Sequence, residues 1–328
     1  MKLLTDEQIR DFRQFIDAHD FFYLTGHKEP DGDCICSCLA LSLLIDSLGK
    51  PFQLLNAGPF KRTEIKKYES AFSHTMQFLT EDERRRSALI IADCSEYSRL
   101  GDIEGDVKNL DTCVIDHHKT ANAPENALCF IDATAPSTCS IVQLLYEGVH
   151  GSVPQRAAEI LFTGFCTDTG FFRFLSTDSA EVFKATARLI SSGANPRATY
   201  DDITGGKSYS SRKLLGAALN NAERYLDGRL IVTCETLDDT QKWGQDGRDS
   251  DALYSLLLSV HGVEAVVFAR QETEHTCTLG FRSKDAVDVS AIAAQFGGGG
   301  HKNASGASCN GQLETLIPSI VKSFARIM

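Results

Sequence analysis

The sequence lacks an excess of basic residues. Its 33 lysines and arginines face 44 aspartates and glutamates, which gives a formal net charge of −11. Proteins that hold long nucleic acid without sequence preference need a cationic face, so this balance argues against such a partner. A small anionic ligand remains compatible with the charge if something cationic occupies its site. Acidic side chains that hold divalent metal ions would meet both conditions.

Long apolar runs are also missing. No stretch of 18 apolar residues occurs, which argues against a membrane-spanning helix. The first residues, MKLLTDEQIRDFRQF, are acidic and amphipathic and do not resemble a secretory signal. The eleven cysteines show none of the paired spacings typical of zinc sites. We therefore expect reduced thiols in a cytoplasmic protein.

The first 193 residues alternate between short apolar runs, which predict strands, and segments with helical periodicity or capping signals. The predicted strands cover residues 21–25, 51–55, 87–92, 112–115 and 128–131. The predicted helices cover residues 5–19, 33–48, 137–149, 157–165 and 179–192. This alternation is typical of a layered α/β domain with a mostly parallel sheet.

The pattern changes after Pro196, where a polar helical stretch reaches about Tyr225. Further on, residues 229–235, 263–270 and 276–282 predict strands, and residues 253–260, 289–296 and 313–326 predict helices. Because 328 residues are too many for a comfortable single core, we expect two α/β domains. They are a larger domain at 1–193 and a smaller one at 213–328, with a linker at 194–212 and the active site in the cleft between them.

Polar side chains gather where the predicted strands end. The segment GHKEPDGDCICS places His27, Asp31 and Asp33 in a loop after the first strand, and Asp93 follows the apolar run SALIIA. Ligands in open α/β sheets bind outside the carboxyl ends of the strands. The positions of these side chains therefore indicate a site at one edge of the sheet.

Two further segments add to this cluster. In TCVIDHHKT, Asp116, His117 and His118 follow another strand, and in GFCTDTGFFRF, Asp168 lies in a loop after a predicted helix. We expect the adjacent histidines to point in different directions. One could then hold a metal while the other faces the substrate or orients a neighbour.

Each segment alone also has an ordinary structural explanation. Asp33 could cap the following helix, and a lone aspartate after a strand is often a turn residue. A salt-bridged network fits less well, because Lys28 and Lys119 are the only bases in the first and third segments. Together, six or seven mostly anionic donors suit two ions roughly 3.5–4 Å apart that share a carboxylate. Carboxylates and imidazoles are suitable ligands for manganese, iron, zinc or magnesium.

These four segments, in this order, resemble the signature motifs of the DHH phosphoesterases, which are named for Asp-His-His. The segment GFRSKDAVDVSAIAAQFGGGGHKNASG resembles the associated C-terminal domain of one branch. The most similar subgroup by layout, the nano-RNase and pAp-phosphatase group, cleaves very short oligoribonucleotides and the 3′-phosphate of adenosine 3′,5′-bisphosphate. The resemblance implies a short oligoribonucleotide or nucleotide substrate, no long-duplex or membrane partner, and compatibility with a homodimer.

The resemblance also assigns metal ligands by motif position. It implies two manganese ions, with cobalt or magnesium as alternatives, and Asp93 would bridge them. The implied ligands of the first ion are His27, Asp31 and Asp93, and those of the second are Asp33, Asp93, His117 and Asp168.

Catalytic and substrate-binding roles follow from the same motifs. His118 would act as a catalytic acid facing the substrate, and Asp116 would orient a ligand histidine. The glycine run at 297–300 would bring backbone N–H groups close to a phosphate, although such a run in isolation is often a flexible loop. The implied substrate-binding residues are Arg99, Arg282, Ser283, Gly298, Gly299, Gly300 and His301.

The first motif departs from the family pattern at Cys34 and Cys36, where alanine and glycine are common. We expect Cys34 and Cys38 to pack on a helix face rather than to serve redox or metal chemistry. Other substrates also stay open at this point: a cyclic dinucleotide or its linear product, pyrophosphate, and polyphosphate. So does a nucleotide-binding regulator without catalysis.

Overall fold

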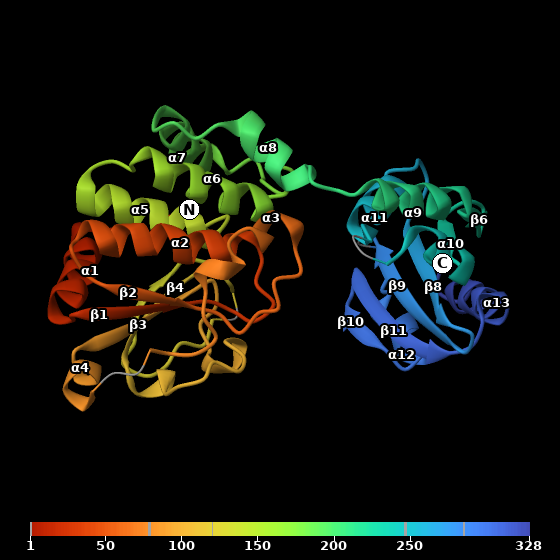
Figure 1. Ribbon diagram of the computed structural model, residues 1–328. Coiled ribbons are helices and arrows are strands. Elements are labelled where there is room, and N and C mark those ends of the chain that lie inside the picture. Colours follow the sequence, from red (N-terminus) through yellow and green to blue (C-terminus); the bar gives the residue numbers. More distant parts are fainter. Residues whose placement is uncertain (1, 78–79, 120, 246–247, 285) are drawn as a thin grey trace. The chain divides into compact units, whose positions relative to one another are not determined.

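The computed structural model describes residues 2–77, 80–119, 121–245, 248–284 and 286–328. The chain divides into two units, the first ending at Gly206 and the second beginning at Lys207. Each unit has its own sheet (Figure 1). Each also has its own core of buried hydrophobic residues. Within the described ranges, no helix is long and apolar enough to cross a membrane.

The first unit is built on a five-stranded parallel sheet with the order β2-β1-β3-β4-β5. Its strands are β1 (Phe21–Thr25), β2 (Phe52–Leu55), β3 (Ser87–Ala92), β4 (Asp111–Asp116) and β5 (Leu128–Ile131). Its helices are α1 (Asp6–Ala18), α2 (Gly32–Ser47), α3 (Thr63–Lys66), α4 (Glu81–Arg85), α5 (Thr138–His150), α6 (Gln155–Asp168), α7 (Ala180–Ser191) and α8 (Pro196–Thr204). The predicted parallel α/β domain is therefore confirmed, with every strand boundary within one residue.

Capping residues fix where the first two helices begin. Thr5 and Gln8 form the predicted capping box at α1, in which each side chain accepts from the backbone N–H of the other. Asp31 caps α2 by accepting from the N–H of Cys34 at 3.1 Å. The alternative in which Asp33 caps this helix is therefore wrong, because Asp33 lies inside the first turn.

The two faces of the sheet are covered differently. Phe22, Leu24 and Ile90 belong to the larger core beneath the helices, whereas the alternate residues Tyr23 and Leu89 belong to a smaller core on the other face. Figure 1 shows α1, α2 and α5 along one face, while loops and the short helix α4 lie along the other. Loops and helix ends meet at the carboxyl edge of the sheet, where the polar segments lie.

Helices α2 and α6 touch at glycines. A Cβ at Gly164 would stand 2.8 Å from the Cβ of Cys36 and 3.3 Å from the Cα of Asp33, and one at Gly32 would stand 2.3 Å from Thr167 Oγ1. Cys34, Cys36 and Cys38 are completely buried, which confirms that these thiols pack in the core. The extra sulfur at position 36 fits because the facing residue on α6 has no side chain.

The second unit is built on a six-stranded mixed sheet with the order β10-β11-β9-β8-β7-β6, in which only β7 and β8 are parallel. Its strands are β6 (Glu223–Tyr225), β7 (Leu230–Glu235), β8 (Ala265–Thr273), β9 (Thr276–Ser283), β10 (Gly299–His301) and β11 (Ala304–Asn310). Its helices are α9 (Tyr209–Asn220), α10 (Leu237–Trp243), α11 (Ser250–Leu258), α12 (Ser290–Gln295) and α13 (Leu313–Phe324). Helices α12 and α13 contribute to one core, and α9 and α11 contribute to another.

Three local expectations need correction. Asp168 is the last residue of α6 rather than a loop residue, and Asp116 is the last residue of β4 rather than the residue after it. The glycine run continues into β10, which pairs antiparallel with β11. A Cβ at Gly298 would stand 2.1 Å from the carbonyl oxygen of Gly306, so glycine is needed there for contact between strands. The sequence did not predict this strand, because the run has few of the β-branched and aromatic residues that are typical of strands.

We expect Gly164→Ala to lower the free energy of unfolding by about 1–3 kcal/mol, because the new methyl group would stand 2.3 Å from Cys139 Sγ on α5 and 2.8 Å from the Cβ of Cys36 on α2. Urea denaturation followed by circular dichroism measures this change. Gly216→Ala in α9, where an added Cβ meets nothing within 4 Å, is the matched control and should be neutral or slightly stabilising. An unchanged midpoint for Gly164→Ala would contradict the close contact.

Candidate active site

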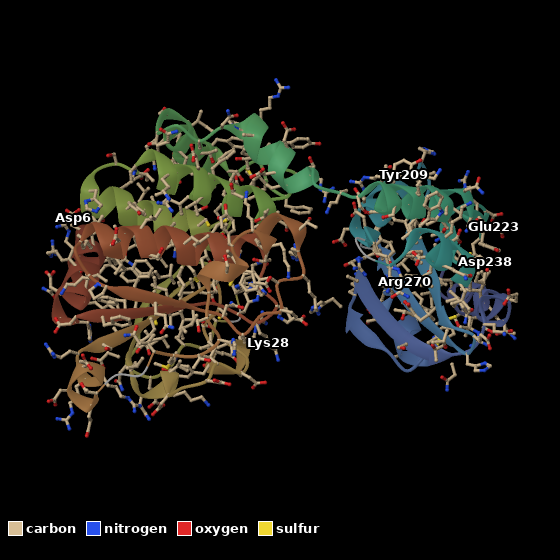
Figure 2. The ribbon with its side chains drawn as sticks, viewed as in Figure 1. Asp6, Lys28, Tyr209, Glu223, Asp238 and Arg270 are labelled. Carbon is tan, nitrogen blue, oxygen red and sulfur yellow. The ribbon has the colours of Figure 1, made fainter. Side chains whose placement is uncertain are left out.

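The carboxyl edge of the parallel sheet gathers three of the predicted residues. Strands β1, β3 and β4 are neighbours, and His27, Asp93 and His117 follow their ends. Lys28, labelled in Figure 2, marks this edge beside β1. Asp93 has a φ of 63°, in the left-handed region that few residues other than glycine adopt, and its N–H donates to the carbonyl of Ile115 at 2.9 Å. The chain therefore bends sharply where it presents the Asp93 carboxylate.

The first donor group surrounds His27. Its Nε2 lies 3.5 Å from Asp93 Oδ2 and 3.8 Å from Asp31 Oδ1. Its Nδ1 lies 2.9 Å from the carbonyl oxygen of Lys28, which can only accept, so Nδ1 carries the proton. Nε2 is thus the nitrogen that faces the two carboxylates, and it is the one available to a metal ion.

The second donor group surrounds His117. Its Nε2 lies 3.3 Å from Asp168 Oδ2, 3.6 Å from Asp93 Oδ1 and 4.0 Å from Asp33 Oδ2. Its Nδ1 faces the carbonyl oxygen of Ala135 at 3.3 Å, which again leaves Nε2 as the free nitrogen. All six residues predicted as metal ligands are therefore brought together, from four separate segments of the chain.

Asp93 belongs to both groups. Its Oδ2 faces His27 and its Oδ1 faces His117, so one carboxylate lies between two sets of nitrogen and oxygen donors. Two donor atoms that each lie about 2.1 Å from one ion are roughly 3–3.5 Å apart. The imidazole nitrogens and carboxylate oxygens here are 3.3–4.0 Å apart, so they would move only slightly closer to hold an ion. The residues present fit a pair of divalent ions.

The charges at the site are crowded. Burial raises the pKa of Asp93 well above its ordinary value, and the neighbouring Asp33 carboxylate adds to the effect. Burial also raises the pKa of Asp168, to about 6, with Asp33 contributing again. Burial alone would lower the pKa of His27, but its contacts with Asp31 and Asp93 outweigh burial and raise it. These neighbouring carboxyl groups resist ionisation because their negative charges repel one another. Bound cations would stabilise the ionised carboxylates.

His118 and Asp116 form a pair beside this cluster. His118 Nδ1 donates to Asp116 Oδ1 at 2.7 Å, and this contact raises the pKa of the half-exposed imidazole. The other carboxylate oxygen, Asp116 Oδ2, is buried and has no hydrogen-bond partner among the described residues. Asp116 is thus paired with His118 and not with His117, the histidine that was predicted to hold the metal. The rings of His117 and His118 lie 4.7 Å apart and both reach Asp93, so the expectation that they point in different directions is wrong.

The sequence did not reveal that the beginning of α5 belongs to the site. The backbone N–H groups of Thr138 and Cys139 donate to the two oxygens of Asp33 at 2.6 and 2.9 Å, and Thr138 Oγ1 donates to Asp93 Oδ1 at 2.9 Å. The positive end of the helix dipole therefore faces two carboxylates. Ser137 is the N-cap, so the sequence marked a helix start, but it could not reveal which side chains the helix end would meet.

The thiol of Cys34 also lies near the donors of His27 and Asp93. Its Sγ is 3.9 Å from the carbonyl oxygen of His27, and the residue is completely buried. Burial raises the pKa of Cys34 well above its ordinary value, so the thiol stays protonated and donates to that carbonyl.

The predicted substrate-binding residues occupy both units. Arg99, in the first unit, is exposed, and its carbonyl accepts from the N–H of Lys28 at 2.8 Å. In the second unit, the Arg282 guanidinium lies 4.6 Å from the ring centre of Tyr254. Ser283 is buried and its hydroxyl donates to the carbonyl of Val287, so it supports a turn. The remaining predicted residues are Gly298, just before β10, and Gly299, Gly300 and His301, which are exposed along it.

Comparisons with known proteins agree with this arrangement. The sequence matches the DHH family, N-terminal domain, over residues 22–165 and the DHHA1 domain over residues 228–328. A bifunctional oligoribonuclease and PAP phosphatase NrnA from Thermus thermophilus is 31% identical over 291 residues, which cover 88% of this chain and 84% of that protein. A probable manganese-dependent inorganic pyrophosphatase from Clostridium acetobutylicum is 32% identical over 179 residues, which cover 52% of this chain and 55% of that protein.

A solved structure shares the fold of the whole chain. The crystal structure of an exopolyphosphatase-related protein from Bacteroides fragilis superposes with a TM-score of 0.80 at 23% identity, and the match covers 99% of this chain and 98% of that one. The motif resemblance is confirmed by these matches. The chain therefore belongs to the DHH family and carries a DHHA1 domain after its DHH domain.

Proposed function

We propose that this protein is a metal-dependent phosphoesterase that hydrolyses very short oligoribonucleotides to nucleoside monophosphates and removes the 3′-phosphate of adenosine 3′,5′-bisphosphate. The observation that carries the proposal is the Asp93 carboxylate, whose two oxygens face two separate imidazoles. The name of the Thermus thermophilus relative, which covers most of both chains, supports this substrate class.

The proposed cofactor is a pair of manganese ions. The donor set consists of imidazole nitrogens and carboxylate oxygens, which suit manganese and also allow cobalt or magnesium. The name of the Clostridium acetobutylicum relative supports manganese among these. Two such ions, when bound, supply Lewis-acid activation of water and neutralise the charge of a phosphate.

The chain's own residues would place and protonate the reacting groups. Asp93 would hold the two donor groups at a fixed separation, and Thr138 would fix the Asp93 carboxylate through its 2.9 Å hydrogen bond. His118, held at Nδ1 by Asp116, would present Nε2 to the leaving ribose oxygen and give it a proton. Asp116 would keep this imidazole in one orientation and one tautomer.

We assign the chemistry to the first unit and part of the substrate binding to the second. Arg282 would contact a substrate phosphate or base, since its guanidinium is held at Tyr254. His301 and the exposed backbone of Gly299 and Gly300 would add contacts to phosphate. Arg99, whose side chain is exposed, would supply a cation in the first unit.

A substrate panel tests the proposed function. Metal-stripped protein reloaded with manganese should turn over a diribonucleotide and adenosine 3′,5′-bisphosphate faster than a cyclic dinucleotide, pyrophosphate or polyphosphate. Pyrophosphate is the strongest competitor, because the Clostridium acetobutylicum relative is named a pyrophosphatase. Turnover of pyrophosphate alone would overturn the proposal, and tight nucleotide binding without hydrolysis in manganese, cobalt or magnesium would favour a regulator.

Asp93→Asn should reduce the manganese content from two ions to at most one per chain, because the amide removes the shared negative charge between the two donor groups. Elemental analysis after dialysis measures the ratio. Asp102→Asn, which changes an exposed aspartate elsewhere in the first unit, is the control and should keep both ions. Two ions retained in Asp93→Asn would rule out the bridging role.

His118→Ala should lower kcat by roughly 10²–10⁴-fold, the range expected for loss of a general acid, while both manganese ions remain bound. Steady-state kinetics on a diribonucleotide and elemental analysis on the same sample separate the two effects. His150→Ala, on the last residue of α5, is the control and should leave kcat unchanged. Loss of an ion in His118→Ala would instead make His118 a ligand, as its proximity to Asp93 also allows.

A further inference from the structure

A turn of strained backbone follows Asp168. Gly170, Phe171 and Phe172 have φ values of 56°, 55° and 74°, so three consecutive residues lie in the left-handed region. That region is disfavoured for bulky side chains, and runs of it persist only where the surroundings hold them. Backbone strain of this kind clusters at active sites and ligand-binding segments.

Hydrogen bonds and rings hold the turn in place. The N–H of Phe171 donates to the carbonyl of Cys166 at 2.8 Å, and that of Phe174 donates to the carbonyl of Thr169 at 3.1 Å. The ring of Phe171 lies 5.2 Å from that of Tyr200. The ring of Phe172 lies 5.5 Å from that of Phe165, in the core. The two strained phenylalanines therefore act as anchors.

The anchored turn presents one aromatic ring to solvent. Phe174 is 65% exposed, the most exposed phenylalanine among the described residues. Its ring lies over Gly170, where an added Cβ would stand 2.6 Å from Phe174 Cε2. The Arg173 guanidinium lies over the same ring, 4.7 Å from its centre. A fixed apolar ring beside a cation provides an exposed flat surface that a planar ligand could cover.

The ring is close to the metal donors. Asp168 Oδ2 lies 3.3 Å from His117 Nε2, and Gly170, over which the ring lies, is two residues further along the chain. Because successive Cα atoms are 3.8 Å apart, the Cα atoms of Asp168 and Gly170 are separated by at most about 7.6 Å. The ring and the donors thus belong to one edge of the first unit.

We propose that Phe174, flanked by Arg173, is a stacking platform for a nucleobase of the substrate whose phosphate occupies the metal site. This inference rests on the proposed function and adds a base-binding element to it. Aromatic rings bind bases through their π-faces, which all four bases possess, and a guanidinium strengthens such stacks. The platform therefore recognises the presence of a base and not its identity.

The test compares Phe174→Ala with Phe183→Ala on two substrates. Phe183 is the matched control, since it is 51% exposed and its ring stacks on Phe172 rather than lying over Gly170. Loss of one base stack predicts a KM for a diribonucleotide that rises roughly tenfold in Phe174→Ala. The KM for a diribose phosphodiester without bases should not change, and neither should kcat or manganese content. Phe174→Trp should restore the diribonucleotide KM, whereas Phe174→Leu should not.

The outcomes separate this inference from the proposed function. If wild-type protein fails to hydrolyse the diribonucleotide, both the proposed function and the proposed stacking platform are wrong. If wild-type protein hydrolyses it but Phe174→Ala raises the KM of both substrates equally, or of neither, only the platform is refuted. An equal rise of the diribonucleotide KM in Phe183→Ala would likewise show a general effect of the aromatic surface and overturn the assignment to Phe174.

Discussion

Repulsion among carboxylates is the constraint on which the first unit depends. Asp33 and Asp93 are buried, and Asp31 and Asp168 are only partly exposed, within contact of the same two imidazoles. The beginning of α5 offsets part of this repulsion by donating two N–H groups and a hydroxyl. The remaining negative charge has no lysine or arginine partner among the ion pairs of the described residues. Bound divalent ions would neutralise the negative charge that the end of the helix leaves uncompensated.

The order of the strands determines which residues can share this environment. The chain runs from β1 to the edge strand β2 and then returns to the other side of β1 with β3. This reversal opens a gap between the connections that follow β1 and β3, and His27 and Asp93 lie there. His117 joins them because β4 lies beside β3. A protein with the same motifs on non-adjacent strands would not gather them.

The sequence predicted the sheet and the convergence of the donors because apolar runs and polar strand ends are local patterns. It could not predict contacts that depend on how helices pack. Thr138 is the clearest case, since its hydroxyl reaches Asp93 from a helix that begins 45 residues further along the chain. The strand at Gly299–His301 was missed because glycine carries almost no strand signal, and its reason for being glycine lies in the partner strand. The pairing of Asp116 with His118 was missed because two adjacent imidazoles were assumed to diverge.

The contact between Gly164 and the backbone of Asp33 has a consequence for how the Asp33 and Asp168 carboxylates can move apart. Asp33 lies in the first turn of α2 and Asp168 ends α6, so the distance between these two carboxylates is fixed where the helices meet without an intervening side chain. At such a contact the two helices cannot move closer together, and they cannot easily move apart. A change in that distance therefore requires α2 and α6 to move as whole helices, because no side chain lies between them to adjust.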